Sequence, residues 1–112
     1  MPPPAVAVGQ QLLAPSATVL AAVIFAGAAA PGVPTSQRDR ARVVNTVLDE
    51  VAEHLGNTRA VARASYVDPR VVERFEEGRT VLRAVRRAGS GDLSDDGVRC
   101  VVERAVLRLL RE

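Results

Sequence analysis

Lysine and tryptophan are absent from this chain of 112 residues, and cysteine and tyrosine each occur once. The 15 basic residues are therefore all arginines. A single cysteine, Cys100, excludes an internal disulfide and a cysteine-rich metal site, and we expect it to be a small buried apolar residue. His54 also stands alone, in the last turn of a predicted helix, where it complements the helix dipole. The sequence thus predicts no metal site and no cofactor.

Aromatic residues make up 3% of the chain, although hydrophobic residues as a whole make up 47%. The core must therefore be built from Ala, Val and Leu, which favours packed helices, and no strand-like alternation is present. The length allows one small domain. A net charge of +2 makes the chain mildly basic, which is compatible with phosphate contacts but too weak to imply them.

The N-terminal part divides into a tail and an apolar run. Residues 1–16 begin with three consecutive prolines after Met1, and we expect a divergent, disordered tail. Residues 17–30 are apolar on all sides and shorter than the roughly 18 residues of a membrane span, so they predict a buried core helix capped by Ser16. A signal peptide is the alternative, since AGAAA resembles a cleavage site, but no basic residue precedes the run.

Further helices are predicted over residues 36–55, 69–77, 79–88 and 95–111, with a short helix between residues 58 and 66. Residues 17–112 therefore predict an all-α domain, a small orthogonal bundle of five or six helices. The predicted stop and start signals are Ser36, Gly56, Thr58, Asp68 with Pro69, Gly78, and Ser94 with Asp95. The predicted inward positions are Val43, Val44, Val47, Leu48, Val51, Ala52, Leu55, Val71, Val72, Phe75, Val81, Leu82, Val85, Val98, Val101, Val102, Ala105, Val106, Leu109 and Leu110.

The only tyrosine, Tyr66, falls at the joint between two predicted helices, within LGNTRAVARASYVDPRVVERFEEG (residues 55–78). This segment resembles the C-terminal active-site segment of the type IB DNA topoisomerases, in their poxvirus-like bacterial branch. A second stretch, ATVLAAV (residues 17–23), resembles the helix that follows the family's Phe-Arg-Thr-Trp motif. Arg59 and Asp68 depart from the family pattern, which usually has proline and often histidine there. The matching residues are Leu55, Gly56, Asn57, Thr58, Ser65, Tyr66 and Pro69.

The resemblance implies the C-terminal part of a topoisomerase IB or tyrosine recombinase-like catalytic domain. It implies ATP-independent relaxation of supercoiled double-stranded DNA, with Tyr66 as the nucleophile of a 3′-phosphotyrosyl intermediate, in the cytoplasm and associated with the nucleoid. The family's general-acid lysine has no counterpart here, and Leu13 and Ser16 fall where the family has an arginine and a histidine or asparagine. We therefore expect a truncated or degenerate N-terminus, a chain that is inactive alone, and a separate fragment as the source of the missing residues.

The chemistry of a tyrosine nucleophile explains these requirements. A tyrosine hydroxyl is protonated at neutral pH and attacks poorly without assistance. Cationic donors aimed at the phosphate oxygens stabilise the developing charge, and the planar fork of arginine suits phosphate best. Arg59, Arg63 and Arg70 lie near Tyr66 in the sequence, so they are the candidate DNA-binding residues, with surface carboxylates as their alternative partners.

Two other functions fit parts of the sequence. The segment LGNTRAVARAS also predicts a helix-turn-helix, with Gly56 at the turn and Arg59 and Arg63 projecting towards DNA, which needs no tyrosine. A third interpretation is an interaction protein, because the helix of residues 17–30 would self-associate if one apolar face were left exposed.

Overall fold

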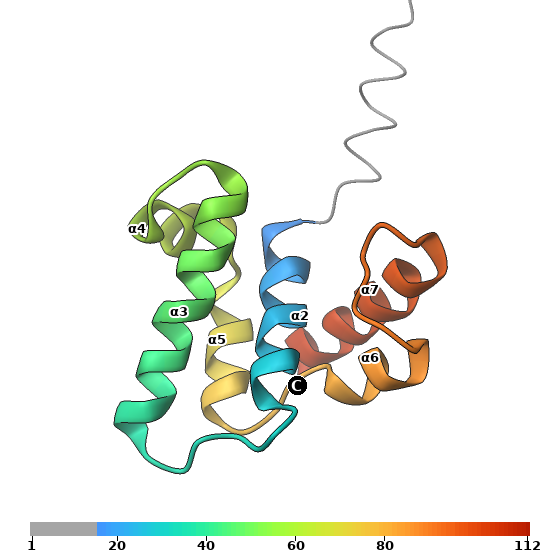
Figure 1. The fold of residues 1–112 in the computed structure, drawn as a ribbon, viewed down its shortest axis with the longest axis horizontal. Coiled ribbons are helices and arrows are strands. Elements are labelled where there is room, and N and C mark those ends of the chain that lie inside the picture. The colour runs from blue at the N-terminus through green and yellow to red at the C-terminus, as the bar shows by residue number, and fades with distance from the viewer. Residues whose placement is uncertain (1–15) are drawn as a thin grey trace, which may run out of the picture.

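The computed structural model of the protein describes residues 16–112, and all the regular structure in that range is helical (Figure 1). The all-α prediction is confirmed for this range. The predictions for the tail, including the placement of Leu13, lie outside it. Within the same range no helix combines the length and apolarity that crossing a bilayer requires. The elements are α2 (Ala17–Ala29), α3 (Gln37–Leu55), α4 (Arg59–Val61), the π-helical turn η1 (Ala62–Tyr66), α5 (Pro69–Glu76), α6 (Leu82–Ala88) and α7 (Asp96–Arg111).

Helix α2 stands in the middle of the molecule, with α3 and α5 on one side and α6 and α7 on the other (Figure 1). A helix that is apolar on all sides needs cover on all sides, and these neighbours supply it. The Ser16 side chain caps α2 by accepting a hydrogen bond from the Val19 amide at 3.1 Å, as predicted. Phe25 of α2 stacks on Phe75 of α5 with ring centroids 4.6 Å apart. The prediction of a core helix is thus confirmed.

Helix α3 buries the predicted apolar stripe against α2. Its start is capped by Ser36, which accepts a hydrogen bond from the Asp39 amide at 3.0 Å. It ends at Gly56, whose φ of 67° is the left-handed conformation that glycine adopts without strain. One predicted inward position is wrong: Leu55 is 36% exposed, because the stripe runs past the core at this end of the helix.

Helices α5 and α6 are joined by a turn that follows the predicted stop. Gly78 has a φ of 83°, and its amide donates to the Phe75 carbonyl at 2.8 Å. Helix α6 then begins at Leu82, three residues later than predicted. The buried side chains also differ in part from the predicted ones. Val81 and Ala84 are buried, whereas the predicted Leu82 and Val85 are only half-buried.

Helix α7 carries the predicted stripe, and its N-cap is Asp95, whose carboxylate accepts from the Val98 amide at 3.0 Å. The prediction that Cys100 is buried is wrong, because its side chain is exposed. Cys100 is two residues from both Val98 and Val102, which places it about 200° around the helix from each of these buried positions. In the loop before α7, Leu93 is buried, although it was not among the predicted inward positions.

Candidate functional site

The segment around Tyr66 folds as a sharp elbow, residues 62–69, which we call the Tyr66 elbow. The helix α4, which leads into the elbow, is capped by Thr58 as predicted, since the Thr58 hydroxyl accepts a hydrogen bond from the Val61 amide at 3.3 Å. After one short turn, α4 widens into η1, where the Val67 amide donates to the Ala62 carbonyl five residues earlier at 3.0 Å. Such π-helical turns are rare and are often found at functional sites. Tyr66 is the last residue of this one.

The chain leaves the elbow in an extended conformation before α5 begins. Val67 and Asp68 have ψ angles of 126° and 123°. Asp68 precedes Pro69, and the residue before a proline avoids the helical region because its backbone would clash with the proline ring. Val67 is buried, at 5% exposure, and anchors the elbow in the core. The Asp68 carboxylate caps α5 by accepting from the Arg70 amide at 2.9 Å. The predicted start signal is thereby confirmed.

A single hydroxyl on α2 fixes the elbow from the other side. Thr18 Oγ1 donates to the Tyr66 carbonyl at 3.3 Å and accepts from the Asp68 amide at 3.0 Å. It therefore satisfies two main-chain groups that neither η1 nor α5 pairs. Thr18 was not among the predicted site residues, although the sequence carried a signal, since Thr18 is the one polar side chain in α2.

The Tyr66 side chain itself faces away from the core. It is 48% exposed, and within residues 16–112 its hydroxyl makes no hydrogen bond. A tyrosine of the core would be covered and would have a partner for its hydroxyl. The fold thus holds the Tyr66 main chain from two sides and leaves the phenol open to an external group.

Two of the three candidate DNA-binding arginines are paired with carboxylates. Arg59 reaches back from α4 to Asp49 on α3 through two hydrogen bonds, of 2.7 and 3.3 Å. Arg70 makes two to the side chain of Asp68, of 2.7 and 3.1 Å, and a third to the Leu110 carbonyl. The hydrogen bond from Arg70 holds the pKa of the Asp68 carboxyl below its ordinary value. A DNA phosphate would have to displace these carboxylates.

The third candidate, Arg63, lines a hollow of about 190 Å³ beneath the elbow. Glu73 and Glu76 of α5 line the same hollow, but among residues 16–112 Arg63 forms no ion pair or hydrogen bond with either of them. The structure thus pairs Arg59 and Arg70 with carboxylates and leaves Arg63 exposed beside two glutamates. That they bind DNA stays a prediction.

The helix-turn-helix alternative has its turn in place but a distorted second helix. Gly56 connects α3 to α4, as that motif requires. However, the second helix has three regular residues before it widens into η1, and Arg59 lies back on α3 instead of projecting from the unit. The geometry therefore favours the Tyr66 elbow as the candidate site.

Comparisons of the chain with protein-family models, with curated proteins and with solved structures found no match. A functional proposal therefore rests on the residues and their geometry. Between residues 16 and 112, no three His, Cys, Asp or Glu side chains are grouped so that they would hold a metal ion.

Proposed function

We propose that the chain is the tyrosine-bearing region of a type IB-like DNA topoisomerase, with double-stranded DNA as its substrate and Tyr66 as its nucleophile. One observation carries the proposal. The two segments that resemble the family, residues 17–23 and 55–78, meet in space, where Thr18 hydrogen-bonds both sides of the Tyr66 elbow. The elbow presents a phenol that is 48% exposed. This arrangement suits attack on a bulky external phosphodiester.

The proposed step is a transesterification. The Tyr66 oxygen attacks the phosphorus, its proton passes to solvent, and the bond from phosphorus to the 5′-oxygen breaks as the phosphotyrosyl bond forms. The leaving 5′-oxygen needs a proton, and general acids contribute about 10²–10⁴-fold to such steps. The chain has no lysine to supply that proton. Arg59 is paired with Asp49 and Arg70 with Asp68, so neither guanidinium is free to stabilise the charge that develops on the phosphate.

We therefore expect the chain alone to relax supercoiled plasmid very slowly, and a lysine-bearing fragment to be needed for efficient turnover. A DNA in which sulfur replaces the leaving 5′-oxygen isolates the nucleophile from the missing acid, because a thiolate leaves without a proton. We expect this DNA to form a covalent adduct with the chain at least about 10²-fold faster than the ordinary DNA. The adduct should be absent from Tyr66→Phe.

Absence of a Tyr66-dependent adduct on the sulfur-substituted DNA would refute the proposal. The helix-turn-helix function predicts another pattern. Under it, salt-sensitive binding of duplex DNA would be lost in Arg59→Ala with Arg63→Ala and unchanged in Tyr66→Phe, and neither DNA would become attached to the chain.

A further inference from the structure

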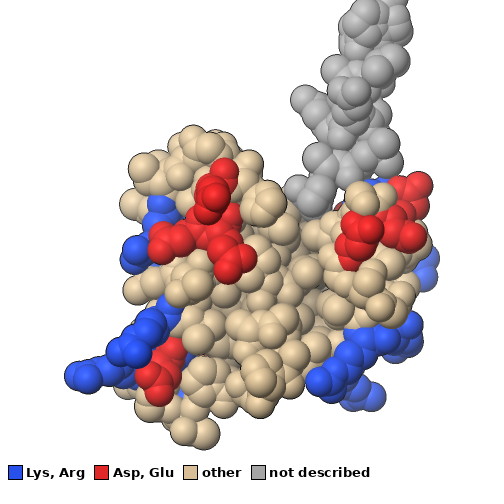
Figure 2. Space-filling view, in the orientation of Figure 1, with Lys and Arg blue, Asp and Glu red and all other residues tan. Residues whose placement is uncertain are grey.

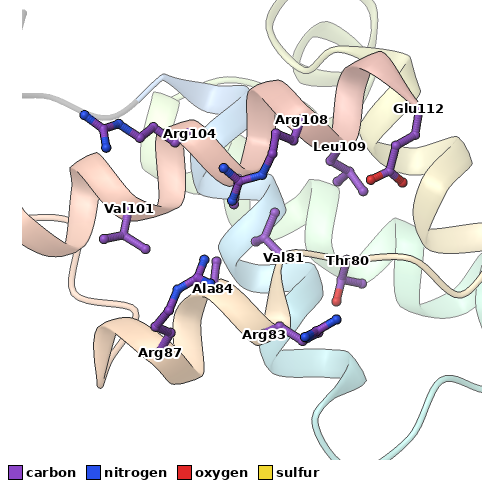
Figure 3. Close-up of a pocket in the computed structure, with 11 residues that line it drawn as sticks. Thr80, Val81, Arg83, Ala84, Arg87, Val101, Arg104, Arg108, Leu109 and Glu112 are labelled. Atoms are coloured by element: carbon purple, nitrogen blue, oxygen red, sulfur yellow. The ribbon is translucent and has the colours of Figure 1, made fainter.

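A groove between α6 and α7 gathers four arginines, and we call it the arginine groove. Its volume is about 690 Å³. Arg83 and Arg87 come from α6, and Arg104 and Arg108 come from α7 (Figure 3). In this view Arg87 and Arg108 reach from the two helices into the space between them, whereas Arg83 extends along the rim towards Thr80. Apolar side chains such as Val81 and Ala84 form the floor.

These four guanidinium groups have no acidic partner. All four side chains are exposed, and within residues 16–112 none of them makes an ion pair or a hydrogen bond. Residues 1–15 contain no Asp or Glu that might pair with them. The one carboxylate that lines the groove, Glu112, is held by Arg79 at 2.7 Å. The groove is therefore an uncompensated positive surface.

Such a surface selects anions with several charges. On each helix the two arginines are four residues apart, so they repeat at about 6 Å along the axis on one face. Like charges at this spacing repel each other, and an anion that lies between the two rows removes the repulsion. Phosphate fits the planar fork of arginine particularly well.

We propose that the arginine groove binds the phosphodiester backbone of a single nucleic-acid strand. Because the arginines lie on two helices and repeat along each of them, a chain of phosphates fits the groove better than a single phosphate ion does. A bilayer surface is broad and would not enter a space between two packed helices. No aromatic side chain lines the groove, so the bases would not stack on the protein, and binding would be independent of sequence. This site is separate from the Tyr66 elbow and does not depend on the function proposed for Tyr66.

The test compares two pairs of substitutions with the same change in net charge. Arg87→Gln with Arg108→Gln removes one arginine from each wall of the groove. Arg38→Gln with Arg42→Gln removes two exposed arginines near the start of α3 and is the matched control. Fluorescence anisotropy with a short unstructured DNA strand, over a series of salt concentrations, gives the affinity and its salt dependence. Circular dichroism checks that both variants are folded.

We expect the groove pair to bind the strand at least about tenfold more weakly than the wild type, as the loss of two charged hydrogen bonds implies. The plot of log affinity against log salt concentration should become less steep, its negative slope shrinking in magnitude by about 1.4, since each of the two lost phosphate contacts of a single strand contributes about 0.7. The control pair should keep both values close to those of the wild type. Tyr66→Phe should also bind like the wild type, which separates this result from that of the adduct assay.

Equal losses in the groove pair and the control pair would overturn the proposal, because net charge alone would then explain binding. So would tighter binding to a duplex of the same sequence or to vesicles of anionic lipid. If the glutamine pair fails to fold, Arg87→Lys with Arg108→Lys serves in its place. This pair keeps the charges, so it should retain the salt slope and lose affinity severalfold, because lysine lacks the fork. An unchanged affinity in the lysine pair would contradict recognition by guanidinium groups.

Discussion

The Tyr66 elbow and the arginine groove use the same residue type in opposite ways. At the elbow, Arg59 and Arg70 are each bound to a carboxylate at 2.7 Å. In the groove, four arginines line one space without acidic partners among residues 16–112, and Arg87 and Arg108 reach into it from the two helices (Figure 3). Figure 2 shows the same contrast, with acidic and basic side chains interspersed on the side of α3 and basic side chains gathered over α6. Nearness to a candidate nucleophile in the sequence therefore does not by itself show which arginines remain available for phosphate, because Arg59 and Arg70 are paired whereas Arg63 is not paired within residues 16–112.

The comparison also separates positioning from binding. The elbow fixes the main chain on both sides of one residue, Tyr66, through the Thr18 hydroxyl. The groove offers several exposed guanidinium groups over an apolar floor. A site that must place one reacting atom needs the first kind of structure, and a site that holds a phosphate chain without regard to sequence needs the second.

The largest effect is expected from a substitution in the core that supports both the Tyr66 elbow and the arginine groove. Phe75 is fully buried and stacks on Phe25, and α2 contacts both α5 and the α6–α7 pair. Phe75→Ala should lower the free energy of unfolding by about 3–5 kcal/mol. Leu107→Ala, at a position that is 53% exposed, is the control and should change it by about 0.5 kcal/mol or less. Urea denaturation measures both, and similar losses would show that the core is not organised around the aromatic pair.

A smaller effect should be confined to the elbow. Thr18→Val keeps the shape of the side chain but leaves the Asp68 amide without its acceptor, at a cost of about 1–2 kcal/mol. Thr46→Val is the matched control, since its hydroxyl bonds only the Arg42 carbonyl within α3. Urea denaturation of both variants should show a loss for Thr18→Val alone, with binding of a DNA strand unchanged. A loss of strand binding in Thr18→Val would mean that the two regions are coupled.

The smallest effect depends on pH. Arg70 lowers the pKa of Asp68 in the folded chain below the value of about 3.9 for an unfolded aspartate. The pair therefore stabilises the fold at neutral pH, and this stabilisation is lost as the pH falls below about 4 through the folded pKa. Asp68→Asn keeps a good helix cap but loses the charge. From neutral to acidic pH, the wild type should lose more unfolding free energy than Asp68→Asn, and equal losses in denaturant titrations would contradict the pairing.

Local signals in the sequence predicted much of the fold. The caps at Ser16, Ser36, Thr58 and Asp95 each depend on a side chain and an amide three residues away, so the sequence alone specifies them. The stripe of α7 follows in the same way from the helical period.

Features that depend on where an element packs were not predictable in this way. Leu55 is in register with a buried stripe, but nothing in the sequence shows that α3 extends past the core. The widening of α4 into η1 has no sequence signature in this segment. The arginine groove depends on the packing of α6 against α7, so the spacing within each helix did not show that arginines of both helices line one space.

The most direct test of the Tyr66 assignment is the position of the covalent bond. After reaction with the sulfur-substituted DNA, trypsin should cleave after Arg63 and Arg70 and release the peptide of residues 64–70, which contains Tyr66. Mass spectrometry should find the nucleotide remnant on this peptide. A remnant on another residue, such as the exposed Cys100, or no remnant at all, would contradict the account.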